Sequence, residues 1–380
     1  MNTVFFDALV LREPYTGVAQ AVHNLIAAVA VADPSRNYRA LIPRTLRARF
    51  PASDNLKITR SWLVGGQSPS VRVFYEQFLL PFRISSHEAR FAHFPAYVAP
   101  RMTYIPFVLT IHDLIAFTHP LFCKGSTVKH FATIMPRNVE KASRICVPSE
   151  FVKRELLKQF SNCSPGKVSV VPFAPATKPS GVTRKEARRV LAEKYGLDKP
   201  YFLFVGNLEI KKNLPTLLRA FFAARMRCKF PHMLVLAGRP GFSYSVVRSA
   251  YEGLAMEEML FQPGFVPQED LPLFYRGATA LCFPSLVEGF GLPVLEALQE
   301  GTPCLLSDIP PFRELAGDCA TYVPMADLVA WREAIERIVD EKLPKPGVED
   351  ARVRRASGFT WERTARATMS VYKSLEEELL

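Results

Sequence analysis

The feature that most constrains the fold of this chain is a regular alternation of apolar, strand-like segments with helix-like segments. The strand-like run 3–11 precedes the helical stretch 18–32, and the apolar run 104–114 follows later in the same half. Strands that alternate with helices in this way form a parallel sheet with helices on both faces. The first half of the chain therefore predicts an α/β domain.

The alternation is interrupted once and then begins again. The stretch 174–199 is polar and charged, and it contains one amphipathic helical pattern at 184–195. Beyond it, alternation resumes with the strand-like run 201–207. We predict two Rossmann-like, doubly wound domains, residues 1–178 and 179–358, followed by a C-terminal helix in 359–380. A length of 380 residues fits two or three domains.

Composition indicates an anionic partner. The formal net charge is +12 and the pI is about 9.4, which favours a nucleotide, a nucleic acid or an anionic membrane face. A generally basic surface without a specific partner is the alternative. No long Lys/Arg block or zinc-knuckle spacing is present, so we do not expect a nucleic acid partner.

Cysteine usage and hydropathy predict a cytoplasmic protein. The seven cysteines are scattered without a C-x-x-C pair, which favours a reducing compartment over a disulfide scaffold. The N-terminus lacks the basic region of a signal peptide. The longest apolar runs fall short of the ~20 residues that a membrane span needs.

The stretch PSLVEGFGLPVLEALQEGTP contains two carboxylates with an unusual placement. The residues 279–285 are strand-like, and a loop with Glu288 follows. A helix then begins near Pro293 and ends before Gly301, with Glu296 about one turn inside it. Ligands bind outside the carboxyl ends of parallel strands, and a helix N-terminus there attracts anions.

Each carboxylate of this stretch can accept hydrogen bonds from sugar hydroxyls. One would bind the ribose of a nucleotide and the other a transferred sugar. The alternative is that Glu296 lies on a solvated helix face and Glu288 is a loop charge. A dehydrogenase is disfavoured because Val294 replaces the third glycine of G-x-G-x-x-G.

The segment EGFGLPVLEALQEGTPCLLSDIPPFREL resembles the signature of retaining GT-B glycosyltransferases of family 4. LFVGNLEIKKNLPTLLRAF, LAGRPG and PGFVPQEDLPLFYRGA resemble neighbouring segments of that family, and TGVAQAVHNLI and LTIHDL resemble its N-terminal half more weakly. The resemblance implies two Rossmann-like domains separated by a cleft, with the helix in 359–380 crossing back onto the N-terminal domain. It also implies glycosyl transfer with retention and without a metal, and the chain has no D-x-D motif.

The same resemblance assigns roles to the carboxylate stretch. The glutamates of the family's E-x7-E motif match Glu288 and Glu296. The first contacts the donor sugar in that family, and the second contacts the ribose. The amides of Gly289, Phe290 and Gly291 would lie near the sugar and the diphosphate.

The loop NLEIKKN places two cations at the carboxyl end of a strand. Lys211 and Lys212 there suit a diphosphate leaving group, whose charge grows during transfer. A solvated lysine pair is the alternative. Lys212 matches the lysine of the resembling family, whereas Asn207 stands where that family has an arginine, which leaves open whether Lys211 replaces it.

The N-terminal half supplies further candidates. His112 and Asp113 follow an apolar strand-like run, and the resemblance places the matching histidine near the donor sugar, although such a histidine can also be a structural hydrogen-bonding group. His93 is a candidate for the cleft or for the core. Gly17 matches one of the family's paired glycines, and Ser149 matches a family motif or is an N-cap.

The stretch 71–83 is aromatic and carries two arginines. It predicts either an amphipathic surface helix that meets lipid-linked acceptors or ordinary domain core. The segment 44–50 adds three arginines to a basic patch. Attachment to the inner face of the cytoplasmic membrane is the corresponding hypothesis.

We therefore predict an enzyme that transfers a hexose from a nucleoside-diphosphate sugar to a saccharide or polyprenyl-linked acceptor. The working hypothesis for the donor is GDP-mannose, used in the synthesis of a surface polysaccharide such as lipopolysaccharide, with no separate cofactor. Two alternatives stay open: a GT-B nucleotide-sugar epimerase, and a catalytically silent protein that binds nucleotide sugar or membrane.

Overall fold

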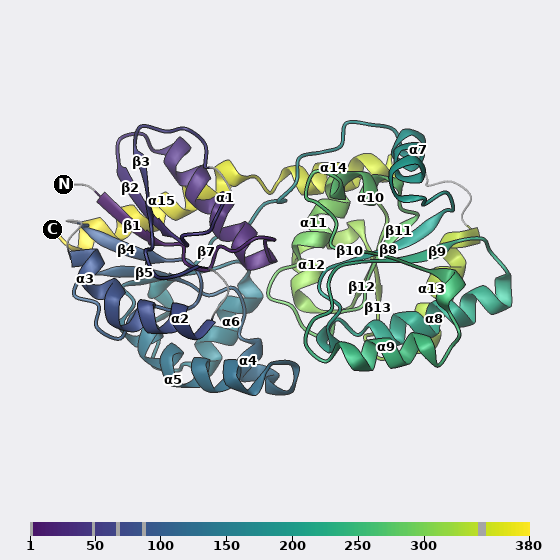
Figure 1. The fold of residues 1–380 in the computed structure, drawn as a ribbon, viewed down its shortest axis with the longest axis horizontal. Coiled ribbons are helices and arrows are strands. Elements are labelled where there is room, and N and C mark those ends of the chain that lie inside the picture. The colour runs from purple at the N-terminus through teal and green to yellow at the C-terminus, as the bar shows by residue number, and fades with distance from the viewer. Residues whose placement is uncertain (1–2, 48–49, 66–68, 86–88, 341–346) are drawn as a thin grey trace. The chain divides into compact units, whose positions relative to one another are not determined.

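The computed structural model describes residues 3–47, 50–65, 69–85, 89–340 and 347–380 (Figure 1). The chain forms two compact units. The first consists of Met1–Pro120, Gly125–Ala176 and Phe359–Leu380, and the second of Leu121–Lys124 and Thr177–Gly358. Both are parallel sheets covered by helices, so the predicted α/β fold class is confirmed.

The first unit contains a seven-stranded parallel sheet of order β3-β2-β1-β4-β5-β6-β7. Its strands are β1 (Thr3–Asp7), β2 (Asn37–Ile42), β3 (Leu56–Arg60), β4 (Phe91–Phe94), β5 (Phe107–Thr110), β6 (Arg144–Val147) and β7 (Val168–Val170). Its helices are α1 (Gly17–Ala32), α2 (Pro69–Phe74), α3 (Leu80–Ser85), α4 (Ile115–Thr118), α5 (Gly125–Lys141), α6 (Glu150–Gln159) and α15 (Trp361–Glu378), with a π-helical turn at Tyr75–Leu79.

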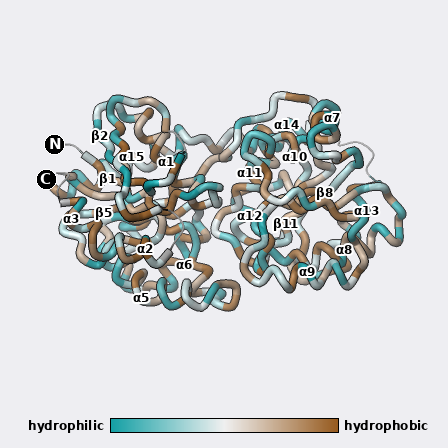
Figure 2. The backbone as a smooth tube through the Cα atoms, in the orientation of Figure 1, coloured by the Kyte–Doolittle hydropathy of each residue, from teal (hydrophilic) through white to brown (hydrophobic). Residues whose placement is uncertain are grey.

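Two hydrophobic clusters cover opposite faces of this sheet. Successive side chains of a strand point to opposite faces, so Phe5 belongs to one cluster and Phe6 to the other. The Phe6 cluster contains residues of α1 and α15, and the Phe5 cluster contains residues of α5 and α6. Figure 2 shows hydrophobic residues along the central strands of each unit.

The second unit contains a six-stranded parallel sheet of order β10-β9-β8-β11-β12-β13. Its strands are β8 (Tyr201–Val205), β9 (Met233–Ala237), β10 (Leu260–Gly264), β11 (Ala280–Phe283), β12 (Cys304–Ser307) and β13 (Thr321–Val323). Its helices are α7 (Arg184–Tyr195), α8 (Leu214–Cys228), α9 (Tyr244–Glu252), α10 (Leu271–Gly277), α11 (Leu292–Gln299), α12 (Pro310–Ala316), α13 (Leu328–Asp340) and α14 (Val348–Ser357).

Each sheet reverses its strand order next to its first strand, between β1 and β4 and between β8 and β11. The loops at the carboxyl ends of such strand pairs diverge to opposite sides, which leaves a crevice for a ligand. In the second unit, every residue of β8 and β11 is buried. The polar groups that can meet a ligand are therefore confined to the loops after these strands.

Local sequence signals place several boundaries well. The predicted helix 184–195 is α7, whose N-terminus is capped by Thr183 and whose C-terminus ends at Gly196 in the left-handed region (φ 70°). The predicted strand 3–11 ends early, at Asp7, because the Asp7 side chain accepts a hydrogen bond from the Leu9 amide (3.0 Å) and turns the chain.

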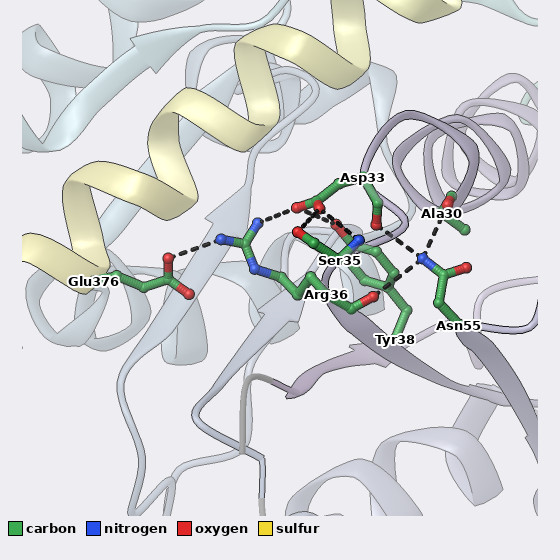
Figure 3. Close-up of polar contacts among 7 residues, drawn as sticks. All are labelled: Ala30, Asp33, Ser35, Arg36, Tyr38, Asn55 and Glu376. Atoms are coloured by element: carbon green, nitrogen blue, oxygen red, sulfur yellow. Dashed lines mark hydrogen bonds and ion pairs between the residues drawn. The ribbon is translucent and has the colours of Figure 1, made fainter.

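The C-terminal helix α15 is held to the first unit by an arginine between two carboxylates (Figure 3). Arg36 donates to Asp33 (2.8 Å) and to Glu376 of α15 (2.7 Å). The Nδ2 of Asn55 donates to the carbonyls of Ala30, Asp33 and Arg36 and fixes the turn that carries this arginine. One network thus joins the turn after α1 to the last helix of the chain.

We expect Glu376→Ala to lower the free energy of unfolding of the first unit by about 1.5–3 kcal/mol, because it leaves a largely buried guanidinium with one carboxylate. The side chain of Glu377 on the same helix is 65% exposed, so Glu377→Ala is the matched control and should change stability little. Urea unfolding of both variants checks this. Equal stabilities would mean that the Arg36–Glu376 pair does not stabilise the docking of α15.

Candidate active site

Two loops of the second unit meet at the point where its strand order reverses. The first follows β8 and runs from Gly206 (φ 140°) through a 3₁₀ turn at Ile210–Lys212. The second follows β11 and leads into α11. The Leu286 amide of the second loop donates to the Lys211 carbonyl of the first (2.9 Å). The two loops are therefore joined directly by backbone.

Lys212 and Glu288 form an ion pair across these loops. The Nζ of Lys212 donates to Oε1 of Glu288, and the Ser285 hydroxyl donates to the same oxygen at 2.9 Å. The side chains of Lys212 and Glu288 are only 13% and 12% exposed. Lys212 Nζ also lies 4.9 Å from the centroid of the Phe283 ring, where the ring face attracts a cation. The sequence predicted both charges here but not that they pair.

Glu296 is buried rather than solvated. It is 5% exposed, and its Oε2 accepts a hydrogen bond from the Tyr275 hydroxyl of α10 at 2.7 Å. Burial, together with the neighbouring Glu296, raises the pKa of Tyr275 well above its usual 10, so the phenol stays a donor. The alternative that Glu296 lies on a solvated helix face is therefore wrong. A buried carboxylate needs a hydrogen-bond donor, and the Tyr275 hydroxyl is one.

The glycine-rich turn before α11 is tightly packed. Gly291 has a φ of 117°, and a Cβ atom added to it would lie 3.0 Å from a ring carbon of Phe312. Any other residue would therefore strain the backbone and press on that ring. Gly289 is buried and Phe290 is 8% exposed. The turn brings the start of α11 against α12.

Lys211 faces a different carboxylate from Lys212. Its Nζ lies 3.4 Å from Oε2 of Glu209, whose Oε1 accepts a hydrogen bond from the Asn207 side chain at 3.3 Å. A Cβ atom on Gly241 would lie 2.2 Å from Cγ of Glu209, so Gly241 makes room for this glutamate. The two lysines thus contact different carboxylates, and the sequence did not single out Glu209.

In the first unit, His112 is a buried, neutral imidazole at the carboxyl end of β5. It lies 2.7 Å from the Pro95 carbonyl through Nε2. A carbonyl can only accept, so Nε2 carries the proton and Nδ1 is an acceptor. Burial lowers the pKa of His112, and its ring stacks on Phe173 (centroids 5.2 Å apart). The structure fixes its orientation as a hydrogen-bonding group.

The remaining candidates of this edge have local structural contacts. Asp113 accepts hydrogen bonds from the Ile115 amide (3.0 Å) and from the Tyr97 hydroxyl (2.6 Å). Ser149 caps α6 by accepting from the Val152 amide (3.2 Å), which confirms its N-cap role. Gly17 is exposed and begins α1.

His93 is a core residue, which confirms the core alternative of its prediction and excludes the cleft alternative. It is 0% exposed, with Nδ1 2.6 Å from the Tyr372 hydroxyl and Nε2 2.7 Å from the Thr110 hydroxyl. Burial lowers its pKa to about 3. His93 lies within the buried strand β4, whereas His112 follows the end of β5, and Tyr372 of α15 covers His93.

A buried charged cluster at the end of β1 was not predicted from sequence. Arg72 Nε lies 3.3 Å from Oε1 of Glu76, which is in the π-helical turn. Burial is the main cause that raises the pKa of Glu76 to about 8 and that of Asp7 to about 6. Burial and Arg72 lower the pKa of His130. Widely separated segments meet here, and no local pattern signals it.

Two further features bear on ligands. Within the ranges that the structure describes, no three His, Cys, Asp or Glu side chains are grouped as metal ligands, and no helix is long and apolar enough to cross a bilayer. In the predicted basic patch 44–50, Arg44 and Arg47 are exposed and Leu46 is buried, whereas residues 48–49 lie outside the described residues.

Comparison with known proteins shows which family the sequence of the second unit resembles. Residues 186–353 match the family model described as "Glycosyl transferases group 1". O-antigen chain mannosyltransferase B of Escherichia coli is 28% identical over 269 residues, which cover 70% of each chain. The chain is a glycosyltransferase whose residues 186–353 match this family.

A second curated protein and a solved structure are also similar to this chain. O-antigen chain mannosyltransferase RfbU of Salmonella typhimurium is 27% identical over 238 residues, which cover 62% of this chain and 61% of that protein. The crystal structure of WaaG, a glycosyltransferase involved in lipopolysaccharide biosynthesis, superposes with a TM-score of 0.75 over 96% of this chain and 98% of that chain, at 14% identity. The fold is therefore GT-B.

We expect the contribution of Glu76 to the free energy of unfolding of the glycosyltransferase to fall as pH rises from about 4.5 to about 8. In this window the folded state keeps a proton on Glu76 that the unfolded chain releases, since the pKa rises from 4.5 to about 8 on folding. Glu76→Gln should reduce the fall in the free energy of unfolding by on the order of 2 kcal/mol.

Urea unfolding at about pH 5 and about pH 8 measures this difference. The facing groups Asp7, Arg72 and His130 stay unchanged in the variant. Glu140→Gln, which alters an exposed carboxylate of α5, is the control and should leave the pH profile as in the wild type. An identical profile for Glu76→Gln would show that Glu76 is ionised in the folded protein.

Proposed function

We propose that this glycosyltransferase moves a hexose, with retention, from a nucleoside-diphosphate sugar to a saccharide or lipid-linked saccharide. The observation that carries the proposal is the Lys212–Glu288 pair, which joins the loops after β8 and β11. This is where a doubly wound sheet binds ligands. One cation and one carboxylate together suit a donor that has both a diphosphate and sugar hydroxyls.

Lys212 is proposed to stabilise the departing diphosphate. A phosphate oxygen is as good a partner for its ammonium group as the Glu288 carboxylate is. When the diphosphate binds Lys212, Glu288 is released to accept hydrogen bonds from the sugar hydroxyls. Both side chains are largely shielded from water, which strengthens their electrostatic effect on the charge that develops during transfer.

Glu296 is proposed to bind the ribose, and Tyr275 to position it. The Tyr275 hydroxyl holds one carboxylate oxygen, and this fixes the orientation of the other. The amides of Gly289, Phe290 and Gly291 are proposed to lie near the diphosphate at the start of α11, where the helix dipole favours an anion. Lys211, Asn207, Gly17 and His112 stay predictions that rest on the resemblance.

The chemistry needs no metal in this proposal. A D-x-D motif is absent from the sequence, and Lys212 supplies a positive charge for the leaving group. The donor phosphate is the proposed base that deprotonates the acceptor hydroxyl. The new glycosidic bond forms as the bond to the diphosphate breaks, and the acceptor's proton leaves with the nucleoside diphosphate.

The donor and pathway are proposed from the names of the relatives. Two of the relatives are named O-antigen chain mannosyltransferases, and the similar WaaG is described as a glycosyltransferase involved in lipopolysaccharide biosynthesis. These names support GDP-mannose as donor and a surface polysaccharide as product. We also propose a place at the inner face of the cytoplasmic membrane, where a lipid-linked acceptor would lie.

GDP should raise the melting temperature more than UDP, TDP or ADP, because only a nucleotide that binds the folded state stabilises it. Glu296→Gln should weaken GDP binding about 10- to 150-fold, since it removes charge-assisted hydrogen bonds worth about 1.5–3 kcal/mol. Tyr275→Phe should weaken it less. Calorimetric titration measures the GDP affinity of the wild type, Glu296→Gln and Tyr275→Phe.

The control for this titration is Glu333→Gln, which alters a glutamate of the same unit whose side chain is 55% exposed. Its GDP affinity should equal that of the wild type. If Glu296→Gln binds GDP as the wild type does, Glu296 only satisfies Tyr275 and the ribose assignment is wrong.

Lys212→Ala and Glu288→Ala should have different effects on binding although both lower turnover. Removal of one preorganised electrostatic contact typically reduces turnover ~10²–10³-fold. Lys212→Ala should also weaken binding of the nucleoside diphosphate. Glu288→Ala should leave that affinity unchanged or higher, because the competing carboxylate has gone, and should weaken binding only of the complete nucleotide sugar.

Transfer of mannose from GDP-mannose to a saccharide acceptor, followed by release of GDP, is the assay for both variants. Wild-type transfer by Glu288→Ala would overturn the proposed role of that glutamate. Free epimerised nucleotide sugar in the absence of acceptor would replace transfer by epimerisation. No release of GDP on addition of any acceptor would leave only a binding protein.

A further inference from the structure

An aromatic row lies exposed on the first unit. Phe74, Phe78 and Phe82 are 51%, 62% and 72% exposed. They are spaced four residues apart along α2, the π-helical turn and α3, and residues with this spacing lie on one face of a helix. The rings of Phe74 and Phe78 are 5.1 Å apart between centroids, so the row is continuous there.

The opposite face of this helical segment is anchored in the core. Tyr75 and Leu80 are 0% exposed and belong to the hydrophobic cluster under the segment. Glu76 is also buried and pairs with Arg72 of the preceding turn. The segment is therefore fixed to the sheet, and packing has already used its apolar inner face. The three exposed rings are an additional apolar surface that the core does not need.

A cavity lined by cations lies in the same unit. Its volume is about 340 Å³, and Arg101, Arg137 and Lys141 contribute to its wall together with Met102 and Tyr104. All five of these residues are classed as exposed. Among the described residues that line the cavity, none is a carboxylate. Its chemistry suits a phosphate group with an apolar attachment.

Gln77 joins the aromatic row to this cavity. Its Oε1 accepts a hydrogen bond from the Arg101 amide (3.1 Å), and its Nε2 donates to the Ala99 carbonyl (3.5 Å). Gln77 directly precedes Phe78, and Arg101 lines the cavity. The segment therefore places exposed aromatic rings beside a group of cations.

The cavity also lies at the opposite edge of the sheet from His112. It includes Phe107, the first residue of β5, and Lys141, which precedes β6. His112 follows the carboxyl end of β5 instead. The cavity is therefore separate from the crevice edge of this unit.

We propose that the surface formed by Phe74, Phe78, Phe82, Arg101, Arg137 and Lys141 docks on an anionic phospholipid bilayer. The rings enter the interface between headgroups and acyl chains, and the cavity binds a lipid headgroup phosphate. Aromatic and apolar groups beside cations are the features that bind such an interface. The inference deepens the proposed use of a lipid-linked acceptor, because it holds the enzyme at the surface where that acceptor lies.

The binding of the purified full-length protein to vesicles tests this proposal. Vesicles of phosphatidylcholine with phosphatidylglycerol should bind the protein, and vesicles of phosphatidylcholine alone should bind it much more weakly. Each Phe→Ser change in the row should weaken binding about tenfold, and each Arg→Gln or Lys→Gln change in the cavity about fivefold. Added salt should weaken wild-type binding.

Two control variants carry three changes each on the second unit, to match a variant with all three rings of the row replaced and a variant with all three cations of the cavity replaced. The apolar control replaces three side chains that are 47–52% exposed, and the charge control replaces three exposed lysines. Their changes are Met226→Ser, Val246→Ser and Val329→Ser, and Lys178→Gln, Lys185→Gln and Lys199→Gln. If only the proposed surface contacts the bilayer, the affinity of each control for the vesicles should be within about twofold of the wild-type affinity.

Three outcomes would overturn the proposal: no binding of the wild type to the anionic vesicles, equal binding to both kinds of vesicle, or equal losses in the surface variants and the controls. Vesicle binding is measured without nucleotide sugar, so it is independent of the proposed reaction. The surface variants should keep wild-type transfer to a water-soluble acceptor and lose transfer only to a vesicle-bound one. A loss of both, with an unchanged melting temperature, would place these residues in the reaction instead.

Discussion

The structure of both units depends on the need of a parallel sheet to be covered on both faces. Strands buried on both sides leave little room for polar side chains, and β8 and β11 are accordingly buried throughout. Polar groups are therefore found in the loops at strand ends. The reversal of strand order beside β8 then brings two of these loops together, and the Lys212–Glu288 pair is the result.

Each charge that this arrangement withdraws from water has a specific partner. Glu288 has Lys212 and Ser285, and Glu296 has the Tyr275 hydroxyl. Partial burial without such partners would be unfavourable by several kcal/mol. A ligand that enters the site must therefore offer equivalent contacts, which a nucleoside-diphosphate sugar does through its phosphates and hydroxyls. Pairing of this kind is a basis for selectivity as well as for stability.

Sequence patterns predicted the parts of the molecule that local chemistry controls. The alternation of segments gave the α/β class, and helix 184–195 was located from its pattern. The E-x7-E spacing found the loop with Glu288 and the helix with Glu296. The N-cap role of Ser149 could be predicted because its side chain bonds an amide only three residues further along the chain. These features depend on contacts within a few residues, so a sequence window contains all the partners.

The tertiary structure alone decided which of these groups are buried and what they face. His93 and His112 both lie in or next to apolar runs, but Tyr372, which is 279 residues away in sequence, covers His93. Tyr275 reaches Glu296 from another helix. The exposed aromatic row includes Phe78, whose exposure depends on which face the core uses. Sequence determined the elements and their loops, whereas burial and pairing followed from long-range packing, which no local pattern encodes.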